Sequence, residues 1–136
     1  MIQSLTSIFL ALCLSLPLAL QAAESGDTPD SPYFVIEEPF TINFLKQSGD
    51  KMRFLQIKVA LKSHDPAILQ SAKTHLPMIQ DALRLLFTDQ SYATISTVAG
   101  RKLLQAQALE RIRSLLEKET GSNKLEQVYF TRFILQ

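Results

Sequence analysis

Few residues in this chain of 136 residues have the chemistry of a catalytic or metal-binding site. The two histidines, His64 and His75, lack the third and fourth ligands at the spacing that a metal site needs. Glu37 and Glu38 lie on an extended segment, where adjacent side chains point to opposite faces and do not share a substrate. No serine or threonine stands in a nucleophile motif. The sequence therefore predicts no catalytic residue, no bound metal and no cofactor, and a chain that is not an enzyme.

The charged residues indicate a solvated surface rather than a site for a polyanion. Arg101, Arg111 and Arg113 form a basic series, but Glu110 and Glu117 interleave with them at helical spacing. The whole chain has 14 Lys and Arg against 13 Asp and Glu, a net charge of +1. Because phosphate binding needs a surplus of basic residues, this balance argues against a nucleic-acid partner.

The N-terminus has the composition of an export segment. Residues 1–23 carry no Asp, Glu, Lys or Arg, and an apolar run occupies residues 8–20. Such a run, followed by small residues, is typical of a secretory signal peptide cleaved after Ala22 or Ala23. The alternative is an uncleaved signal anchor, because residues 5–23 are just long enough to cross a bilayer as a helix. Both interpretations place the rest of the chain on the periplasmic side of an inner membrane.

The exported part divides into a linker and one domain. Residues 24–32 are all polar, Gly or Pro, so they bury no apolar area and are predicted to form a flexible linker. Residues 33–136 have the length and composition of a single domain. The only cysteine, Cys13, precedes both, so the exported part has no thiol and no disulfide.

The start of the domain predicts a β-hairpin. Apolar and β-branched residues at 33–36 stop at Pro39, and an alternating segment resumes at 40–44. A turn signal at 47–50 separates this segment from the clearest alternation in the chain. In that second strand Gln56, Lys58 and Lys62 point one way, as in a strand buried on one face, and the residues opposite are Leu55, Ile57, Val59 and Leu61.

A helical pattern follows the hairpin. Asp65 is a suitable N-cap, and Pro66 fits the first helical position. The apolar stripe comprises Ile68, Leu69, Ala72, Leu76, Ile79, Leu83 and Leu86. Pro77 interrupts this stripe, so a kink or two successive helices are expected near Leu76.

A short turn at 92–95 leads to a second long helix, predicted at residues 98–119. Thr97 supplies its N-cap, and Gly121 supplies its end. The buried arc of this helix comprises Leu104, Ala108, Leu109, Ile112, Leu115 and Leu116.

The final segment, 125–136, is rich in aromatic and β-branched residues. It predicts a strand buried on most of both faces, which lies inside the sheet rather than at its edge. The fold class is therefore α+β. A small antiparallel-type sheet, made of the N-terminal hairpin and the C-terminal strand, is covered on one face by two or three helices.

One group of residues could bind a partner. If the first helical segment continues past its proline, Met78, Ala82 and Leu85 form a second apolar stripe beside the main one. Arg101 and Gln105 fall on the apolar arc of the last helix, where a polar residue usually lies beyond the edge of the core. These five residues are either the margin of the core or a surface for a neighbouring subunit or another protein.

Four segments in residues 33–136 form a recognisable series. In chain order they are Pro39-Phe40-Thr41-Ile42-Asn43, Pro77-Met78-Ile79-Gln80-Asp81, Gly100-Arg101-Lys102-Leu103-Leu104 and Val128-Tyr129-Phe130-Thr131-Arg132-Phe133-Ile134-Leu135-Gln136. This series resembles the FliL family of flagellar basal-body-associated proteins. The closing segment, at the C-terminus, is the most specific of the four.

The resemblance implies a periplasmic, non-enzymatic accessory of the flagellar motor, with a fold similar to stomatin/prohibitin-type domains. It implies a homo-oligomeric ring around the stator units, contacts with stator proteins and other basal-body components, and support of flagellar rotation and swarming. Members of the family carry one N-terminal membrane span preceded by basic residues.

The N-terminus departs from that pattern, because no Lys or Arg precedes Lys46. If residues 1–23 are cleaved, the domain is a soluble periplasmic protein. In that case the alternative function is an adaptor or scaffold of the same fold with a non-flagellar partner. If they are retained, residues 5–23 anchor the domain to the inner membrane.

Overall fold

The computed structural model of the chain describes residues 31–44 and 52–136. The predicted export segment 1–23, most of the predicted linker 24–32 and the predicted turn 47–50 lie outside the described residues. Those described form the strands β1 (Tyr33–Asn43), β2 (Phe54–Lys62) and β3 (Gln127–Leu135), and the helices α1 (Pro66–Thr74), α2 (Leu76–Thr88), α3 (Tyr92–Ile95) and α4 (Val98–Thr120).

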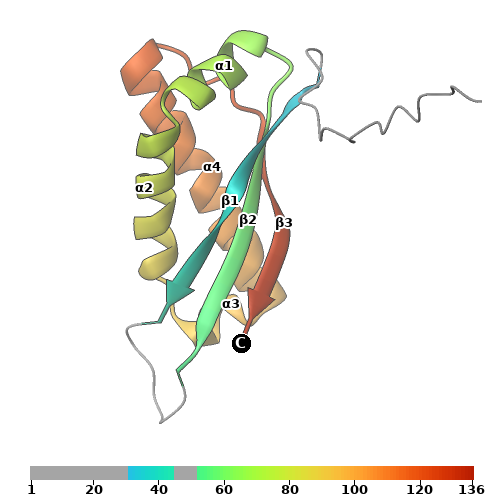
Figure 1. Cartoon of the computed structure of the whole chain (residues 1–136), viewed down its shortest axis with the longest axis vertical. Helices are drawn as coiled ribbons and strands as arrows, with labels where there is room; N and C mark the ends of the chain where they lie inside the picture. Colours follow the sequence, from blue (N-terminus) through green and yellow to red (C-terminus); the bar gives the residue numbers. More distant parts are fainter. Residues whose placement is uncertain (1–30, 45–51) are drawn as a thin grey trace, which may run out of the picture.

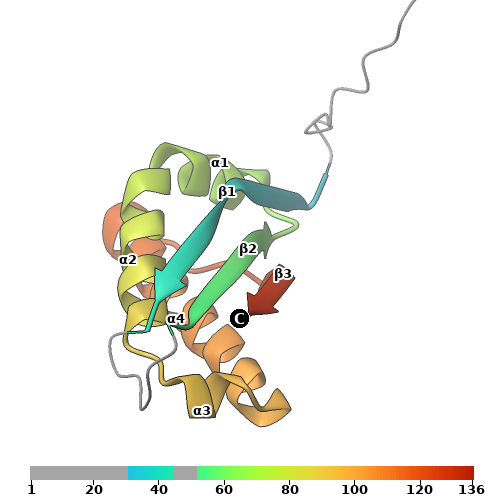
Figure 2. The ribbon, with the colours of Figure 1, turned by 60° about the horizontal axis from the view of Figure 1, so that its bottom comes forward.

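The three strands form one antiparallel sheet in the order β1-β2-β3. Figures 1 and 2 show α2 and α4 side by side on one face of this sheet, with the other face uncovered by any described helix. The α+β class, with a sheet made of the N-terminal hairpin and the C-terminal strand, is confirmed. The described residues contain four helices rather than two or three, because the first helical segment is split and the turn at 92–95 is helical.

The central strand, β2, supplies the middle of the core. Its four inward side chains are fully buried, as predicted, and they are Leu55, Ile57, Val59 and Leu61. The fully buried residues that face them from α4 include Leu104, Ala108, Ile112 and Leu116, while Leu109 and Leu115 of the predicted arc are only half-buried. Burial of an aliphatic side chain contributes roughly 1.5–3 kcal/mol, so this contact supplies much of the free energy that holds the helices on the sheet.

β3 is an edge strand that pairs with β2 alone, so the prediction that it lies inside the sheet is wrong. Its register with β2 shifts where Thr131 is an extra residue beside Lys58. The bulge reverses the alternation of side chains along β3. The residues that pack on the core are therefore Val128, Phe130, Phe133 and Leu135. Because of the bulge, apolar residues occur at both odd and even positions of β3, although this strand is covered on one face only.

β1 continues through Pro39, and the predicted interruption there is a bulge within one strand. Its register with β2 shifts between Ile36 and Phe40, so residues 37–39 stand opposite Lys58 alone. Proline suits this position, because it has no N–H to contribute to a regular ladder. Both outer strands thus bulge at the same point of the central strand.

The break expected near Leu76 is confirmed, because α1 and α2 are separate helices that run in different directions (Figure 1). At the start of α1, Asp65 Oδ1 accepts a hydrogen bond from the backbone N–H of Ala67 at 3.0 Å, as its N-cap role requires. At the junction, His75 Nδ1 and the His75 backbone nitrogen each lie 2.9 Å from the carbonyl oxygen of Ser71. The histidine thus caps the end of α1.

The last helix begins where it was predicted to begin and ends one residue later. The Thr97 hydroxyl accepts a hydrogen bond from Gly100 N–H at 3.0 Å, and Gly121 ends the helix with a φ of 76°. Gly100 is also a point of very close approach between α3 and α4. A Cβ atom added there would lie 1.8 Å from the carbonyl oxygen of Thr94, so only glycine fits.

We expect Gly100→Ala to lower the free energy of unfolding by about 3 kcal/mol, because the backbone of Thr94 has to move. The matched control is Gly121→Ala, where nothing lies within 4 Å of the added Cβ and only the positive φ is strained. That control should cost about 1 kcal/mol. Urea unfolding followed by circular dichroism measures both variants, and equal losses would contradict the close approach.

Candidate functional site

Met78 and Leu85, which were predicted as part of a possible partner surface, are exposed on α2. The exposed fractions of these residues are 43% and 59%, and Ala82 between them is half-buried. The residues of α2 that are buried in the core are Ile79, Leu83, Leu86 and Phe87. The core therefore does not account for the two large exposed side chains.

Arg101 and Gln105 lie elsewhere, on the part of α4 that contacts α3 and β3. Gln105 Nε2 donates a hydrogen bond to the carbonyl oxygen of Val128 at 2.6 Å. Arg101 Nε donates to the carbonyl oxygen of Ile95 at 3.0 Å, and the guanidinium lies 4.8 Å from the centre of the Phe133 ring. These two residues have partners inside the domain, and the structure does not bring them together with the apolar stripe of α2.

Leu103 is an exposed apolar residue that the sequence reasoning missed. Its exposed fraction is 55%, on the side of α4 that does not pack on the sheet. The sequence held a signal, because Leu103 directly precedes Leu104 and so falls about a quarter turn outside the buried arc. Both α2 and α4 lie on the same face of the sheet (Figure 2). We call Met78, Ala82, Leu85 and Leu103 the helical outer surface.

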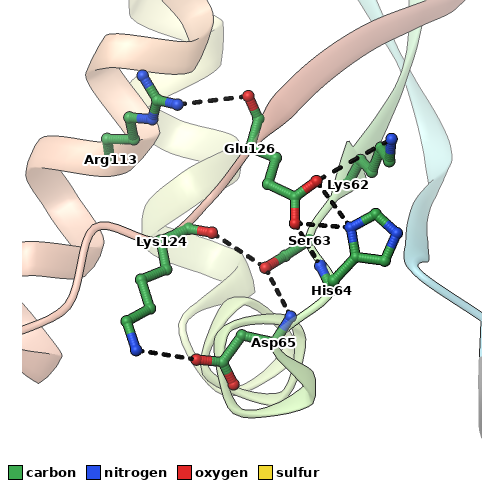
Figure 3. Close-up of polar contacts among 7 residues, drawn as sticks. All are labelled: Lys62, Ser63, His64, Asp65, Arg113, Lys124 and Glu126. Atoms are coloured by element: carbon green, nitrogen blue, oxygen red, sulfur yellow. Dashed lines mark hydrogen bonds and ion pairs between the residues drawn. The ribbon is translucent and has the colours of Figure 1, made fainter.

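The densest group of polar contacts lies where β2 meets α1 and where the chain enters β3 (Figure 3). The carboxylate of Glu126 accepts a hydrogen bond from His64 N–H at 2.7 Å, and His64 Nδ1 lies 2.8 and 2.9 Å from its two oxygens. Lys62 Nζ lies 4.0 Å from the same carboxylate. One side chain thus joins the start of β3 to the end of β2. We call Lys62, Ser63, His64, Asp65, Arg113, Lys124 and Glu126 the polar junction.

Two further residues of the polar junction tie down the segment before β3. The Ser63 hydroxyl, 1% exposed, donates to the carbonyl oxygen of Lys124 at 3.0 Å and accepts from Asp65 N–H at 3.1 Å. Arg113 Nε donates to the carbonyl oxygen of Leu125 at 2.7 Å, and its Nη2 donates to that of Glu126 at 3.3 Å. The approach to β3 is thereby fixed from β2 on one side and from α4 on the other.

These contacts shift the titration of Glu126. The pKa of its carboxyl group is lowered from 4.5, first by the hydrogen bond from the His64 backbone N–H and then by the contact with the His64 ring. Partial desolvation acts in the opposite direction, and the charges of His64 and Lys62 lower the pKa further. The carboxylate is thus the stable form in the folded domain.

The chemistry available to the polar junction is structural. The Ser63 hydroxyl is buried and already donates to a carbonyl oxygen, so it is not presented to a substrate. Across residues 31–44 and 52–136, no group of three or more His, Cys, Asp or Glu side chains is placed to hold a metal ion. Neither His64 nor His75 faces such a group, and both hydrogen-bond to neighbouring elements of the fold.

The family model for the flagellar basal body-associated protein FliL matches residues 33–136. The chain belongs to the FliL family. The matched range runs from the start of β1 through the end of β3, so the helical outer surface and the polar junction both lie within the FliL region.

Curated relatives agree with this membership. The chain is similar to the flagellar protein FliL of Escherichia coli K12, with 31% identity over 106 residues that cover 78% of this chain and 66% of that protein. Identity to FliL of Aquifex aeolicus is 26% over 76% of this chain and 60% of that protein. Identity to the flagellar protein LafL of Vibrio parahaemolyticus is 22% over 85% of this chain and 80% of that protein. The chain thus spans just under two thirds of the two FliL relatives.

Within the part of the chain that the structure describes, no helix combines the length and the apolar character needed to cross a bilayer.

Glu126→Gln should reduce stability at neutral pH and lose that effect in acid. The folded-state pKa of Glu126 lies below 4.5, so the stabilisation is complete above the unfolded-state pKa and disappears as the pH falls through the folded-state pKa. Thermal unfolding between pH 7 and pH 3 should show the wild-type and variant curves converging at low pH. The control is Glu119→Gln, on the exposed last turn of α4. A gap between wild type and Glu126→Gln that stays constant with pH would contradict the role given to the carboxylate.

Gln105→Ala should lower the free energy of unfolding by about 1–3 kcal/mol, the cost of leaving the Val128 carbonyl without its donor. Gln107→Ala, two residues along the same helix and exposed, is the control and should cost less than about 0.5 kcal/mol. Denaturant unfolding compares the two variants. Equal stability of both would mean that Gln105 is free to serve another role.

Proposed function

We propose that this FliL-family chain is a non-enzymatic accessory of the flagellar basal body. It supports stator function and flagellar rotation through periplasmic contacts with stator proteins and with other copies of itself. FliL membership over residues 33–136 supports the setting, and the exposed helical outer surface supports a role in contact. A domain similar to the stomatin/prohibitin type, assembled as a ring, is the form of assembly that we propose.

The observation that carries the contact role is the exposure of Met78, Leu85 and Leu103. Their exposed fractions are 43, 59 and 55%, although the fully buried core of the domain is complete without them. Large exposed apolar side chains on one layer could form a surface that another protein covers. Arg101 and Gln105 belong to this proposal only through their support of β3, because their polar groups already have partners.

The proposed location is the periplasmic side of the inner membrane. Residues 1–23 either direct export and are cleaved after Ala22 or Ala23, or remain as an anchor formed by residues 5–23. The N-terminal residue of the protein isolated from cell envelopes decides between these forms. A chain that starts at Ala23 or Glu24 is free in the periplasm, and a chain that retains Met1 is anchored.

Leu85→Glu should leave the domain folded and abolish its contribution to motility. Because Leu85 is 59% exposed, a charge there costs little in the isolated domain but is strongly unfavourable in a covered apolar contact. The measurement is swimming and swarming of a strain in which the deleted gene is replaced by the variant. Far-ultraviolet circular dichroism and the thermal midpoint of the purified variant report folding.

The matched control is Gln70→Glu, which adds the same charge at an exposed position of α1, away from the helical outer surface. It should support motility as the wild type does. Co-purification from cross-linked envelopes should recover stator proteins with the wild type and the control but not with Leu85→Glu. Normal swimming, swarming and stator recruitment in the deletion strain would overturn the motor role, and capture of a non-flagellar partner would replace it.

A further inference from the structure

One of the two edges of the described sheet lies along β1. Phe44 N–H donates to the carbonyl of Arg53, and Ser63 N–H donates to the carbonyl of Pro32, so the even-numbered residues of β1 bond to β2. The backbone groups of the alternate residues therefore point away from β2, and these residues are exposed. They are Tyr33, Val35, Thr41 and Asn43.

At the opposite edge, along β3, α4 contacts the start of the strand. Val128 pairs with Leu61, whose own backbone bonds belong to β1, so the Val128 carbonyl points outward from the sheet. Gln105 Nε2 donates a hydrogen bond to that carbonyl at 2.6 Å. The Arg101 guanidinium lies over the Phe133 ring farther along the strand. A side chain of α4 thus satisfies one outward carbonyl of β3.

Residues 37–39 interrupt the β1 edge at its midpoint. Pro39 has no N–H, and Glu37 and Glu38 are exposed carboxylates in a bulge. An ion pair of 3.0 Å between Glu37 and Lys58 Nζ ties the bulge to the central strand. An incoming strand would find outward backbone groups only in two short stretches, one on each side of the bulge, and the Tyr33 N–H already donates to Ser31 Oγ at 3.4 Å. Proline, charge and a bulge are three of the devices by which natural sheets protect their edges.

These residues would prevent a second copy of this chain from pairing along β1. If two β1 strands met antiparallel about a two-fold axis at their centres, Glu38 of one copy would lie opposite Glu38 of the other. Directly opposed like charges destabilise a strand pair, and the bulges would keep the two backbones apart. We propose that Glu37-Glu38-Pro39 is an edge guard that prevents β1 of one molecule from pairing with β1 of another.

The test removes the segment at 37–39 and measures pairing between the β1 strands of two molecules. Deleting Glu37 and Glu38 together with Pro39→Thr restores a one-to-one register opposite Lys58 and keeps Ile36 and Phe40 facing the core. In the full chain, purified in a mild detergent, the association constant from sedimentation should rise roughly tenfold or more. Hydrogen exchange of the backbone amides at 41 and 43 should slow as the protein concentration rises.

A second variant keeps the test decisive if the deletion does not fold. Glu38→Thr combined with Pro39→Thr preserves the length of β1, removes one charge and adds an N–H, so it should give a smaller rise in association and the same local protection. Glu119→Gln serves as the control for loss of one carboxylate. A folded variant with wild-type association and wild-type exchange at both amides overturns the edge guard. This outcome is independent of the flagellar role, which the Leu85→Glu experiment tests.

Discussion

The rest of the structure depends on β2 being buried on one face and paired on both sides. Its row of inward side chains, Leu55 to Leu61, is fully buried and fills the space under the helices. Both neighbouring strands change register beside Lys58, so irregularities of β1 and β3 meet at one level of the sheet. Bulges increase the local twist, and Figure 2 shows β1 changing direction along its length. A regular central strand with two bulged neighbours therefore lets a small sheet curve around a single layer of helices.

The last helix, α4, supports β3 and the segments beside it through its polar side chains. Three of its polar side chains reach backbone carbonyls outside the helix. Arg101 binds that of Ile95, Gln105 that of Val128, and Arg113 those of Leu125 and Glu126. Polar residues on an otherwise apolar arc are thus explained by the position of α4, which lies over the core but also runs beside the outer edge of β3. The Val128 carbonyl is one that an edge strand would otherwise leave to water, while the others belong to α3 and to the segment that leads into β3.

Local signals in the sequence predicted most of the fold, and non-local ones were missed. The hairpin, the caps at Asp65 and Thr97 and the end at Gly121 depend on residues within a few positions of each other, and all are confirmed. The place of β3 in the sheet depends on Thr131, whose bulge shifts apolar residues from one parity to the other and imitates a strand buried on both faces. No local pattern reveals that shift. The exposure of Leu85 and the intramolecular partners of Gln105 likewise depend on which helix faces which strand, so the sequence could mark these residues without assigning their roles.

The surfaces of the domain are suited to different kinds of association. Strand addition needs a continuous row of free backbone groups, whereas β1 offers two short stretches separated by its bulge, and the Val128 carbonyl on the β3 edge is already bonded to Gln105. The uncovered face of the sheet is partly closed by its own side chains, because Tyr33 and Tyr129 lie 6.2 Å apart between ring centres and leave Ala60 only 4% exposed. Exposed large apolar side chains are found both on the strands, at Tyr33, Val35, Phe54, Tyr129 and Ile134, and on the helices, at Met78, Leu85, Val98 and Leu103. A contact through the helices would use side chains alone, so its strength would depend on individual residues and the two sheets would stay separate.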